Sequence, residues 1–271
     1  MDATTLLAMA ALVAAIGAFA GVLAGLLGVG GGIVLVPAYL FAFTALGFEG
    51  PDLMRICVAT SLATIVATSL RSLQAHHRRG AVDWAILRAW APGIALGALG
   101  GMLTVAALPS EALQALFAAL ALGVGLYLAL GRADWRVADA MPGPLGRAAL
   151  SPGVGFLSVL MGIGGGSFGV PIMTLHGVPM HRAVATAAGF GLAIAVPSVV
   201  GFLLAPVAPP RPPFQAGSVN LVAFALTVAM TFVTAPLGAR LAHRTDARRL
   251  RRVFGWFLVV VAANMAAGLL R

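Results

Sequence analysis

The chain has 271 residues, of which 61% are hydrophobic and 9% are charged, and its mean hydropathy is +1.01. Soluble globular proteins are far less apolar, so the composition indicates a polytopic membrane protein. The formal net charge of +9 comes from arginines in short segments between apolar runs, where they orient helices in a membrane, and this placement argues against nucleic-acid binding.

The first part of the chain, residues 1–135, is predicted to form one set of membrane segments. An uncharged run at 6–46 has room for two helical arms, and glycines at 28–32 break it because glycine is a poor helix former. The residues before this run lack the basic region of a cleavable signal peptide, so we take it as the first membrane segment. After an acidic loop at 49–52, spanning helices are predicted at 56–73, 84–107 and 112–130.

A cytoplasmic linker at 136–147 is predicted to lead into a second part, residues 148–271, with the same order of segments. This part opens with a glycine-broken run at 148–175. Further spanning helices are predicted at 183–205, 219–237 and 253–270. The chain is thus divided into a first transmembrane repeat, a linker and a second transmembrane repeat.

The two parts share a sequence pattern. Residues 28–32 (GVGGG), with Pro37 five residues on, recur as residues 162–166 (GIGGG) with Pro171 in the same place. Matches that keep one order along both parts indicate a duplication. Further matches are 59–60 with 185–186, 80–83 with 217–220, and Leu113 with Leu250.

The arginine distribution predicts how the segments are oriented. If basic loops face the cytoplasm, residues 71–79, 132–147 and 240–252 share one side of the membrane, and the acidic loop at 49–52 lies on the other. This holds only if the run at 148–175 returns to the side it left, so we expect a re-entrant hairpin there. Its arms of roughly 10 to 15 residues would each reach about half way across a 30 Å core.

Giving the first run the same hairpin makes the two parts inverted repeats, while the alternative, in which residues 6–46 cross the membrane twice, stays open. The predicted fold class is therefore all-α: a polytopic transmembrane helix bundle of two inverted repeats, each with a glycine-broken, re-entrant hairpin plus three spanning helices. In this architecture, broken helices of opposite orientation build a central binding site for alternating access.

The glycine breaks are the main candidate for a binding site. Non-helical backbone is tolerated at membrane depth only where protein or a water-filled cavity satisfies its polar groups. A glycine run exposes N–H groups, and the start of the next helix adds partial positive charge, so the predicted ligand is an anion. The alternative interpretation is that these glycines only let helices pack closely.

Few polar side chains lie at membrane depth. Thr60 and Ser61 follow the first glycine break, and Ser167 and Thr186 lie in the second part. A single hydroxyl in a membrane helix most often bonds to its own backbone. Thr60 and Thr186, however, are repeated on the helix that follows each break, so both are predicted to line the cavity.

Other classes of site are not indicated. No Asp or Glu lies at the centre of a span, Asp83 is predicted to begin a helix, and the lone Cys57 excludes a thiolate metal site. Neither glycine motif has the Lys-Ser/Thr ending of a phosphate-binding loop. We therefore expect no enzyme activity, no cofactor and no metal. Arg55 and Arg182 are predicted to anchor helix starts at the interface, with attraction of anions as the alternative.

Residues 21–32 (GVLAGLLGVGGG) with Pro37, the second copy at 155–171, and residues 181–188 (HRAVATAA) resemble the sulfite exporter TauE/SafE family. The likeness covers nearly the whole chain. It implies a multi-pass permease of the bacterial inner membrane that moves sulfite, sulfoacetate or other organosulfonates, usually outward. One departure is that Ala187 stands where Ser61 stands in the first copy.

These expectations describe a secondary transporter for a small anion in the lipid bilayer. An anion channel, or an importer of a related anion such as thiosulfate, is the alternative, and the coupling ion and a homo-oligomeric state stay open. The candidate substrate-binding residues are Gly30, Gly31, Gly32, Thr60, Ser61, Gly164, Gly165, Gly166, Ser167 and Thr186.

Overall fold

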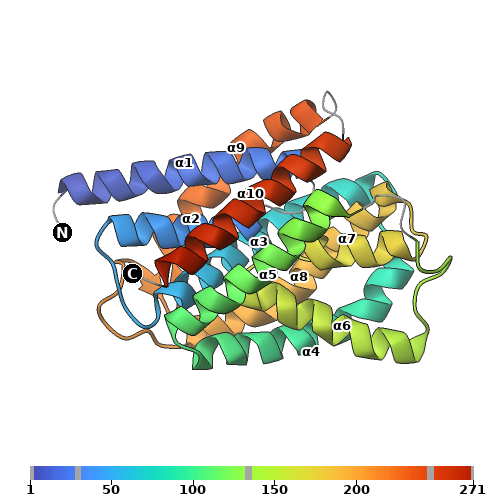
Figure 1. Ribbon diagram of the computed structural model, residues 1–271, viewed down its shortest axis with the longest axis horizontal. Coiled ribbons are helices and arrows are strands. Elements are labelled where there is room, and N and C mark those ends of the chain that lie inside the picture. Colours follow the sequence, from blue (N-terminus) through green and yellow to red (C-terminus); the bar gives the residue numbers. More distant parts are fainter. Residues whose placement is uncertain (1–2, 28–31, 132–135, 243–246, 270–271) are drawn as a thin grey trace.

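The computed structural model describes residues 3–27, 32–131, 136–242 and 247–269, and within them the chain is almost entirely helical (Figure 1). The helices are α1 (Ala3–Leu27), α2 (Gly32–Ala45), α3 (Leu53–Arg78), α4 (Trp84–Ala107), α5 (Ser110–Leu130), α6 (Pro144–Leu160), α7 (Gly166–Leu175), α8 (Met180–Leu204), α9 (Leu221–Ala242) and α10 (Ala247–Gly268). A two-stranded antiparallel ribbon, β1 (Gln215–Ala216) and β2 (Val219–Asn220), precedes α9 and has no counterpart among the predicted elements.

Several of these helices are long and apolar enough to cross a membrane, which confirms the predicted polytopic helix bundle. They are α1, α3, α4, α5, α8 and α9. α4 occupies its predicted range, whereas α3 runs on to Arg78, past the predicted end at 73. The extension arises because arginine and glutamine favour helix even where the apolar run has stopped.

The second glycine motif interrupts the helix as predicted, since α6 ends at Leu160 and α7 begins at Gly166. α7 has 10 residues, so its length of about 15 Å is half the thickness of a bilayer core. α6 has 17 residues, which is longer than the predicted arm, and it begins inside the range predicted for the linker. Pro144 lies in its first turn, where proline suits a helix start.

The first glycine motif lies mostly outside the described residues, because 28–31 fall there. Before it, α1 has 25 residues and contains an 18-residue window able to span a membrane, whereas α2 after it has 14 residues. Figure 1 shows α2 running back toward the end of the molecule at which the N-terminus lies. The pair therefore consists of a long helix and a short returning one.

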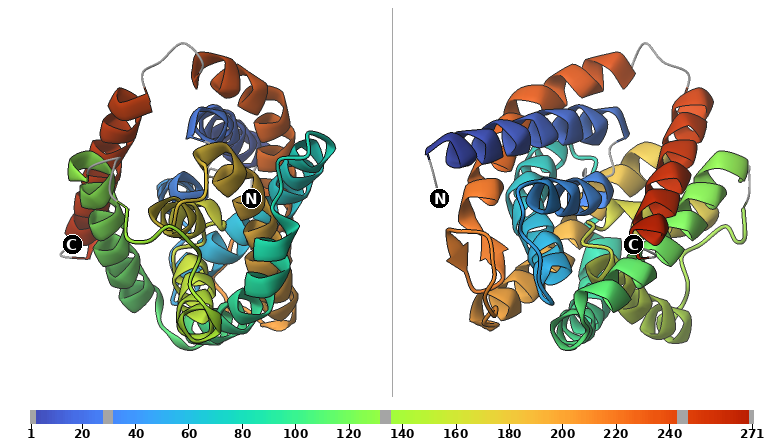
Figure 2. Two further views of the ribbon diagram at one scale, coloured as in Figure 1. Left: turned by 90° about the vertical axis from the view of Figure 1, so that its right-hand side faces the viewer. Right: turned by 60° about the vertical axis from the view of Figure 1, so that its left-hand side comes forward.

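Helices from the two parts of the chain are interleaved. α1 packs against α9 and α5 against α10, as both views of Figure 2 show, and α4 packs against α6. α3 and α8 pack against each other, and α3 is buried without interruption from Leu53 to Ile65. Each of these helix pairs joins a segment before the predicted linker to a segment after it.

Loops gather at two opposite ends of the bundle, on the left and right of Figure 1. We call them the Asp52 end (46–55, 106–111 and 205–218) and the Asp83 end (76–84, 136–143 and 175–182). At the Asp52 end, Ser110 N donates to Pro51 O at 2.9 Å. At the Asp83 end, Val137 N donates to Leu175 O at 2.8 Å, so the linker and the end of the basic loop at 71–79 share this end.

Candidate functional site

The break between α6 and α7 starts with a left-handed turn. Gly162 has a φ of +58°, and the N–H groups of Gly162 and Ile163 donate to α6 carbonyls three and five residues back, both at 2.9 Å. This is the Schellman pattern of helix ends, which favours glycine at the left-handed position. A Cβ on Gly162 would also lie 2.6 Å from Val36 Cγ2 and 3.2 Å from Val58 Cα, so α2 and α3 enclose the turn.

The start of α7 carries N–H groups that have no acceptor among the residues the structure describes. Within the described residues, no N–H from 164 to 168 donates a hydrogen bond, and the first that does is Gly169, to Gly165 O at 2.9 Å. Residues 164–166 are buried, and the Ser167 hydroxyl is buried as well, with no partner in the described chain. Buried helix starts normally satisfy these donors with a cap or a ligand, and their partial positive charge suits an anion.

The start of α2 meets this break. Ser61 Oγ, on α3, donates to Gly162 O at 2.7 Å and lies 3.5 Å from Gly32 O. A Cβ on Gly32 would lie 2.8 Å from Gly162 O. The structure thus brings Gly32 and Ser61 to the turn at Gly162, two residues before Gly164, while Gly30 and Gly31 lie outside the described residues.

Gly165 also supports the packing interpretation. A Cβ there would collide with the side chain of Phe190 and would lie 2.8 Å from both Ala187 O and Gly191 N. Only glycine lets α7 approach α8 this closely. The glycines of the break therefore have two roles, since they permit tight packing and leave the N–H groups of α7 uncovered.

Thr60 and Thr186 each bind a backbone N–H from the other part of the chain. Asn220 N donates to Thr60 Oγ1 at 3.0 Å, and Asp83 N donates to Thr186 Oγ1 at 2.9 Å. Both hydroxyls are on fully buried residues. A threonine hydroxyl that accepts one hydrogen bond keeps its own proton to donate, so a ligand contact remains open to each.

The two residues that face these threonines are helix caps. Asp83 Oδ1 accepts from Ile86 N at 3.1 Å at the start of α4, and Asn220 Oδ1 accepts from Ala223 N at 2.9 Å at the start of α9. Asp83 was predicted to begin a helix, and this is confirmed. The hydrogen bonds to the threonines were missed, although the match of 80–83 with 217–220 is a signal that places Asp83 and Asn220 at equivalent positions.

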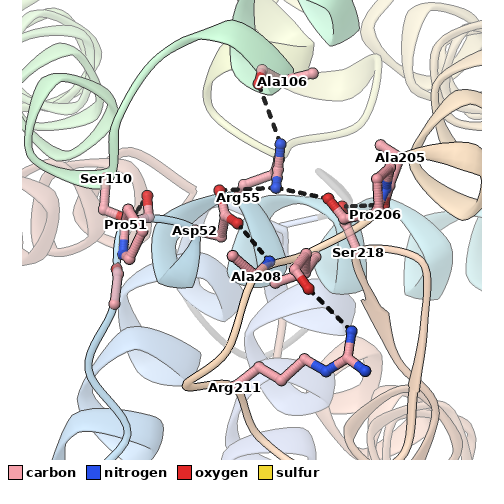
Figure 3. Close-up of polar contacts among 12 residues, drawn as sticks. Pro51, Asp52, Arg55, Ala106, Ser110, Ala205, Pro206, Ala208, Arg211 and Ser218 are labelled. Carbon is pink, nitrogen blue, oxygen red and sulfur yellow. Dashed lines mark hydrogen bonds and ion pairs between the residues drawn. The ribbon is translucent and has the colours of Figure 1, made fainter.

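Of the two arginines in the first turns of α3 and α8, Arg55 differs from the predicted interfacial anchor because it is buried, whereas Arg182 is exposed at the end of the bundle. Arg55 is buried at the Asp52 end and pairs with Asp52 at 2.7 Å, because residues of two further loops fold over it (Figure 3). Arg182 is 45% exposed and pairs with Asp83 at 3.1 Å at the opposite end. These two arginines therefore form ion pairs at opposite ends of the bundle.

A shallow groove of about 640 Å³ lies elsewhere on the molecule, between α4 and α8. Its lining is apolar apart from Arg88, and it includes Pro92, Gly189 and Pro197. Neither α7 nor α2 contributes to it. This groove suits hydrocarbon chains of the bilayer, and the glycine break is a separate site.

Comparison with known proteins gives one family and several relatives. The family model described as "Sulfite exporter TauE/SafE" matches residues 13–265. A "Probable membrane transporter protein" of Haemophilus influenzae is 32% identical over 251 residues, which cover 92% of this chain and 95% of the relative. A protein with a similar name from Methanocaldococcus jannaschii is 28% identical over 197 residues, covering 70% and 71% of the two chains. No solved structure gives a significant match.

Proposed function

Because the chain belongs to the sulfite exporter TauE/SafE family, we propose that this multi-pass membrane transporter is a secondary carrier that exports small sulfur-containing anions. Sulfite, sulfoacetate and other organosulfonates are the proposed substrates, and the bacterial inner membrane is the proposed location. The observation that carries the proposal is the start of α7, where a row of buried N–H groups and the Ser167 hydroxyl have no acceptor among the described residues.

The chemistry of this site favours an oxyanion. Toward an anion, the N–H groups of a helix start and a serine hydroxyl act as hydrogen-bond donors. The partial positive charge of the α7 start attracts the same anion. Sulfite and sulfonates present several oxygens to such donors. Within the described residues no carboxylate lies in this part of the chain to compete for the donors, because the nearest acidic residues in sequence are Asp139 and Asp246.

The proposed cycle is alternating access between two inverted repeats. Two observations support it: the Thr60–Asn220 and Thr186–Asp83 hydrogen bonds join equivalent positions across the two parts, and α2 and α7 run back toward opposite ends in Figure 1. Broken helices of opposite orientation around one site are the arrangement that rocking transporters use. By the positive-inside rule, the Asp83 end faces the cytoplasm.

A serine substitution tests the site. Ser167→Ala removes a hydroxyl that has no partner in the described chain, so the fold should be unaffected. A hydrogen bond to a charged ligand contributes about 1.5–3 kcal/mol to the free energy of binding, so its loss should weaken sulfite binding roughly 10- to 100-fold. Binding of radiolabelled sulfite and sulfoacetate to purified protein measures this.

The matched control is Ser198→Ala, because the Ser198 hydroxyl is also buried but donates to Ile194 O of its own helix at 2.8 Å. Its affinity for sulfite should equal that of the unmodified protein. A Ser167→Ala affinity for sulfite equal to that of the unmodified protein would refute the site.

In proteoliposomes, efflux of labelled sulfite that accelerates when unlabelled sulfite is added on the opposite side indicates a carrier, whereas current without exchange indicates a channel.

A further inference from the structure

Among the residues whose burial the structure describes, which leave out 242–251, Arg55 is the only Asp, Glu, Lys or Arg that is buried, with 9% of its surface exposed. Its guanidinium joins segments that are far apart in the chain. Nη1 donates to Ala106 O at 3.1 Å, Nη2 donates to Pro206 O at 2.9 Å, and Nη2 pairs with Asp52 Oδ1 at 2.7 Å (Figure 3).

The Asp52 carboxylate holds a second segment in place. While Oδ1 pairs with Arg55, Oδ2 accepts from Ala208 N at 3.0 Å, and this bond fastens the loop that follows α8. Asp52 therefore links Arg55 to the loop over the Asp52 end. Its side chain is 20% exposed, twice the value for Arg55, so the carboxylate can reach solvent more easily than the guanidinium can.

The guanidinium of Arg55 can donate a further hydrogen bond. Its Nε is buried and has no hydrogen-bond partner in the described part of the chain. An arginine presents five N–H donors in a planar fork, which binds oxyanions through two parallel hydrogen bonds. A buried arginine needs an anionic partner at all times, because leaving one charge buried and unpaired is strongly destabilising.

Arg55 lies on the same helix as a residue that contacts the glycine break. Arg55 and Ser61 are six residues apart on α3, which is about 9 Å along the helix axis. Ser61 donates to Gly162 O at the break. Arg55 is therefore the buried cation that lies toward the Asp52 end from the break.

We propose that Arg55 is a second anion-binding station, at which the transported oxyanion replaces the Asp52 carboxylate. The exchange keeps the guanidinium paired throughout. It also frees Ala208 N from Asp52 Oδ2, so of the two bonds that join Asp52 and Arg55 to the loop after α8, only that from Arg55 Nη2 to Pro206 O is kept, and the Asp52 end loosens when an anion arrives. Once the anion has left, Asp52 returns to Arg55 and closes this end. The inference rests on the proposed function, because it takes the same anion as ligand.

Three variants test the station with sulfite as the probe. Asp52→Asn removes the negative charge that competes with sulfite for Arg55, so sulfite should bind roughly 10-fold more tightly to the purified protein. Arg55→Gln removes the station, so the affinity of the station for sulfite should fall at least 10-fold while binding at the start of α7 remains. In the double variant, Asp52→Asn should give no gain, since there is then no guanidinium to free. Arg55→Lys keeps the charge but lacks the fork, so its affinity should fall between those of Arg55→Gln and the unmodified protein.

Arg211→Gln is the matched control, because Arg211 is an exposed arginine at the same end that donates only to Val207 O at 2.9 Å. Its sulfite affinity should not change. Size-exclusion profiles and melting temperatures establish that each variant is folded. If Asp52→Asn binds sulfite no more tightly than the unmodified protein, the station is refuted. If the unmodified protein binds neither sulfite nor sulfoacetate, the proposed function itself fails. If it binds sulfite and Ser167→Ala weakens that binding, but Asp52→Asn does not strengthen it, the station alone fails.

Discussion

At the scale of single residues, the described chain joins its two parts through side-chain hydroxyls. Thr60 accepts from the start of α9 and Thr186 from the start of α4, while Ser61 donates to the α6–α7 break. A hydroxyl is small enough to lie between packed helices and can still satisfy a backbone group that would otherwise be buried without a partner. These contacts therefore stabilise the packing of the two parts against each other.

We predict that Thr60→Val destabilises the protein more than Thr186→Val. Both changes keep the side-chain shape and remove the acceptor of a backbone N–H. Asn220 is fully buried, so its N–H is left without water, at a cost of about 1–3 kcal/mol, whereas Asp83 is partly exposed and its N–H can be hydrated. The midpoint of denaturant-induced unfolding of the purified variants measures the difference. The reverse order of midpoints would contradict it.

For single residues, the sequence predicted features that depend on neighbours in the chain and missed features that depend on the packing of distant segments. Asp83 could be predicted as a helix start because it precedes an apolar run. The burial of Arg55 could not, because an arginine beside a loop is typical of an interface, and its burial depends on Ala106 and Pro206, which lie 51 and 151 residues away in the chain.

At the scale of elements, the α6–α7 break depends on one left-handed turn. We predict that Gly162→Ala destabilises the protein by about 1–2 kcal/mol from the left-handed conformation alone. The cost should rise further through contact with Val36 Cγ2, which lies 2.6 Å from the position of the new Cβ. The melting temperature of the purified variant measures the loss.

Gly153→Ala is the control, because Gly153 lies within α6 and a Cβ there would have no neighbour within 4 Å. Alanine favours helix over glycine, so the control should melt at the same or a slightly higher temperature. Equal melting temperatures for the two variants would mean that the turn is not needed.

Element positions were largely predictable from hydropathy, as the agreement for α4 shows. Pairing of elements was not, because apolar helix faces in a membrane do not specify their partners by hydrophobicity. The sequence offered no means to foresee that α1 packs against α9. Figure 2 shows this pairing, and the residues that form it are glycines and threonines, such as Gly17 against Thr227.

At the scale of the whole molecule, the two ends are closed unequally. Arg55 at the Asp52 end is buried and contacts three segments, whereas Arg182 at the Asp83 end is half exposed and contacts Asp83 across a single ion pair. A half-exposed ion pair contributes at most about 1 kcal/mol. The Asp83 end should therefore open more readily, which agrees with loading of an exported anion from the side that the basic loops occupy.

Asp83→Asn tests this difference between the ends. Asparagine keeps the helix cap and the backbone bond to Thr186, as Asn220 does in the second part, but it loses the ion pair to Arg182. Amide hydrogen exchange should become up to about fivefold faster in peptides covering 79–86 and 180–186, and should not change in 50–55. Arg136→Gln, which breaks the exposed Arg136–Asp139 pair at the same end, is the control and should leave all three peptides unchanged.

The interleaving of helices also determines when, during synthesis, each helix can pack against its partner. α1 leaves the ribosome first, yet its packing partner α9 is complete only at Ala242, and α5 waits for α10. The glycine face of α1 must therefore remain uncovered, or be covered by lipid, through most of translation. A chain that stops at the linker lacks α6 to α10, so α1, α4 and α5 are without their packing partners α9, α6 and α10, and the first part cannot bury these helix faces by itself.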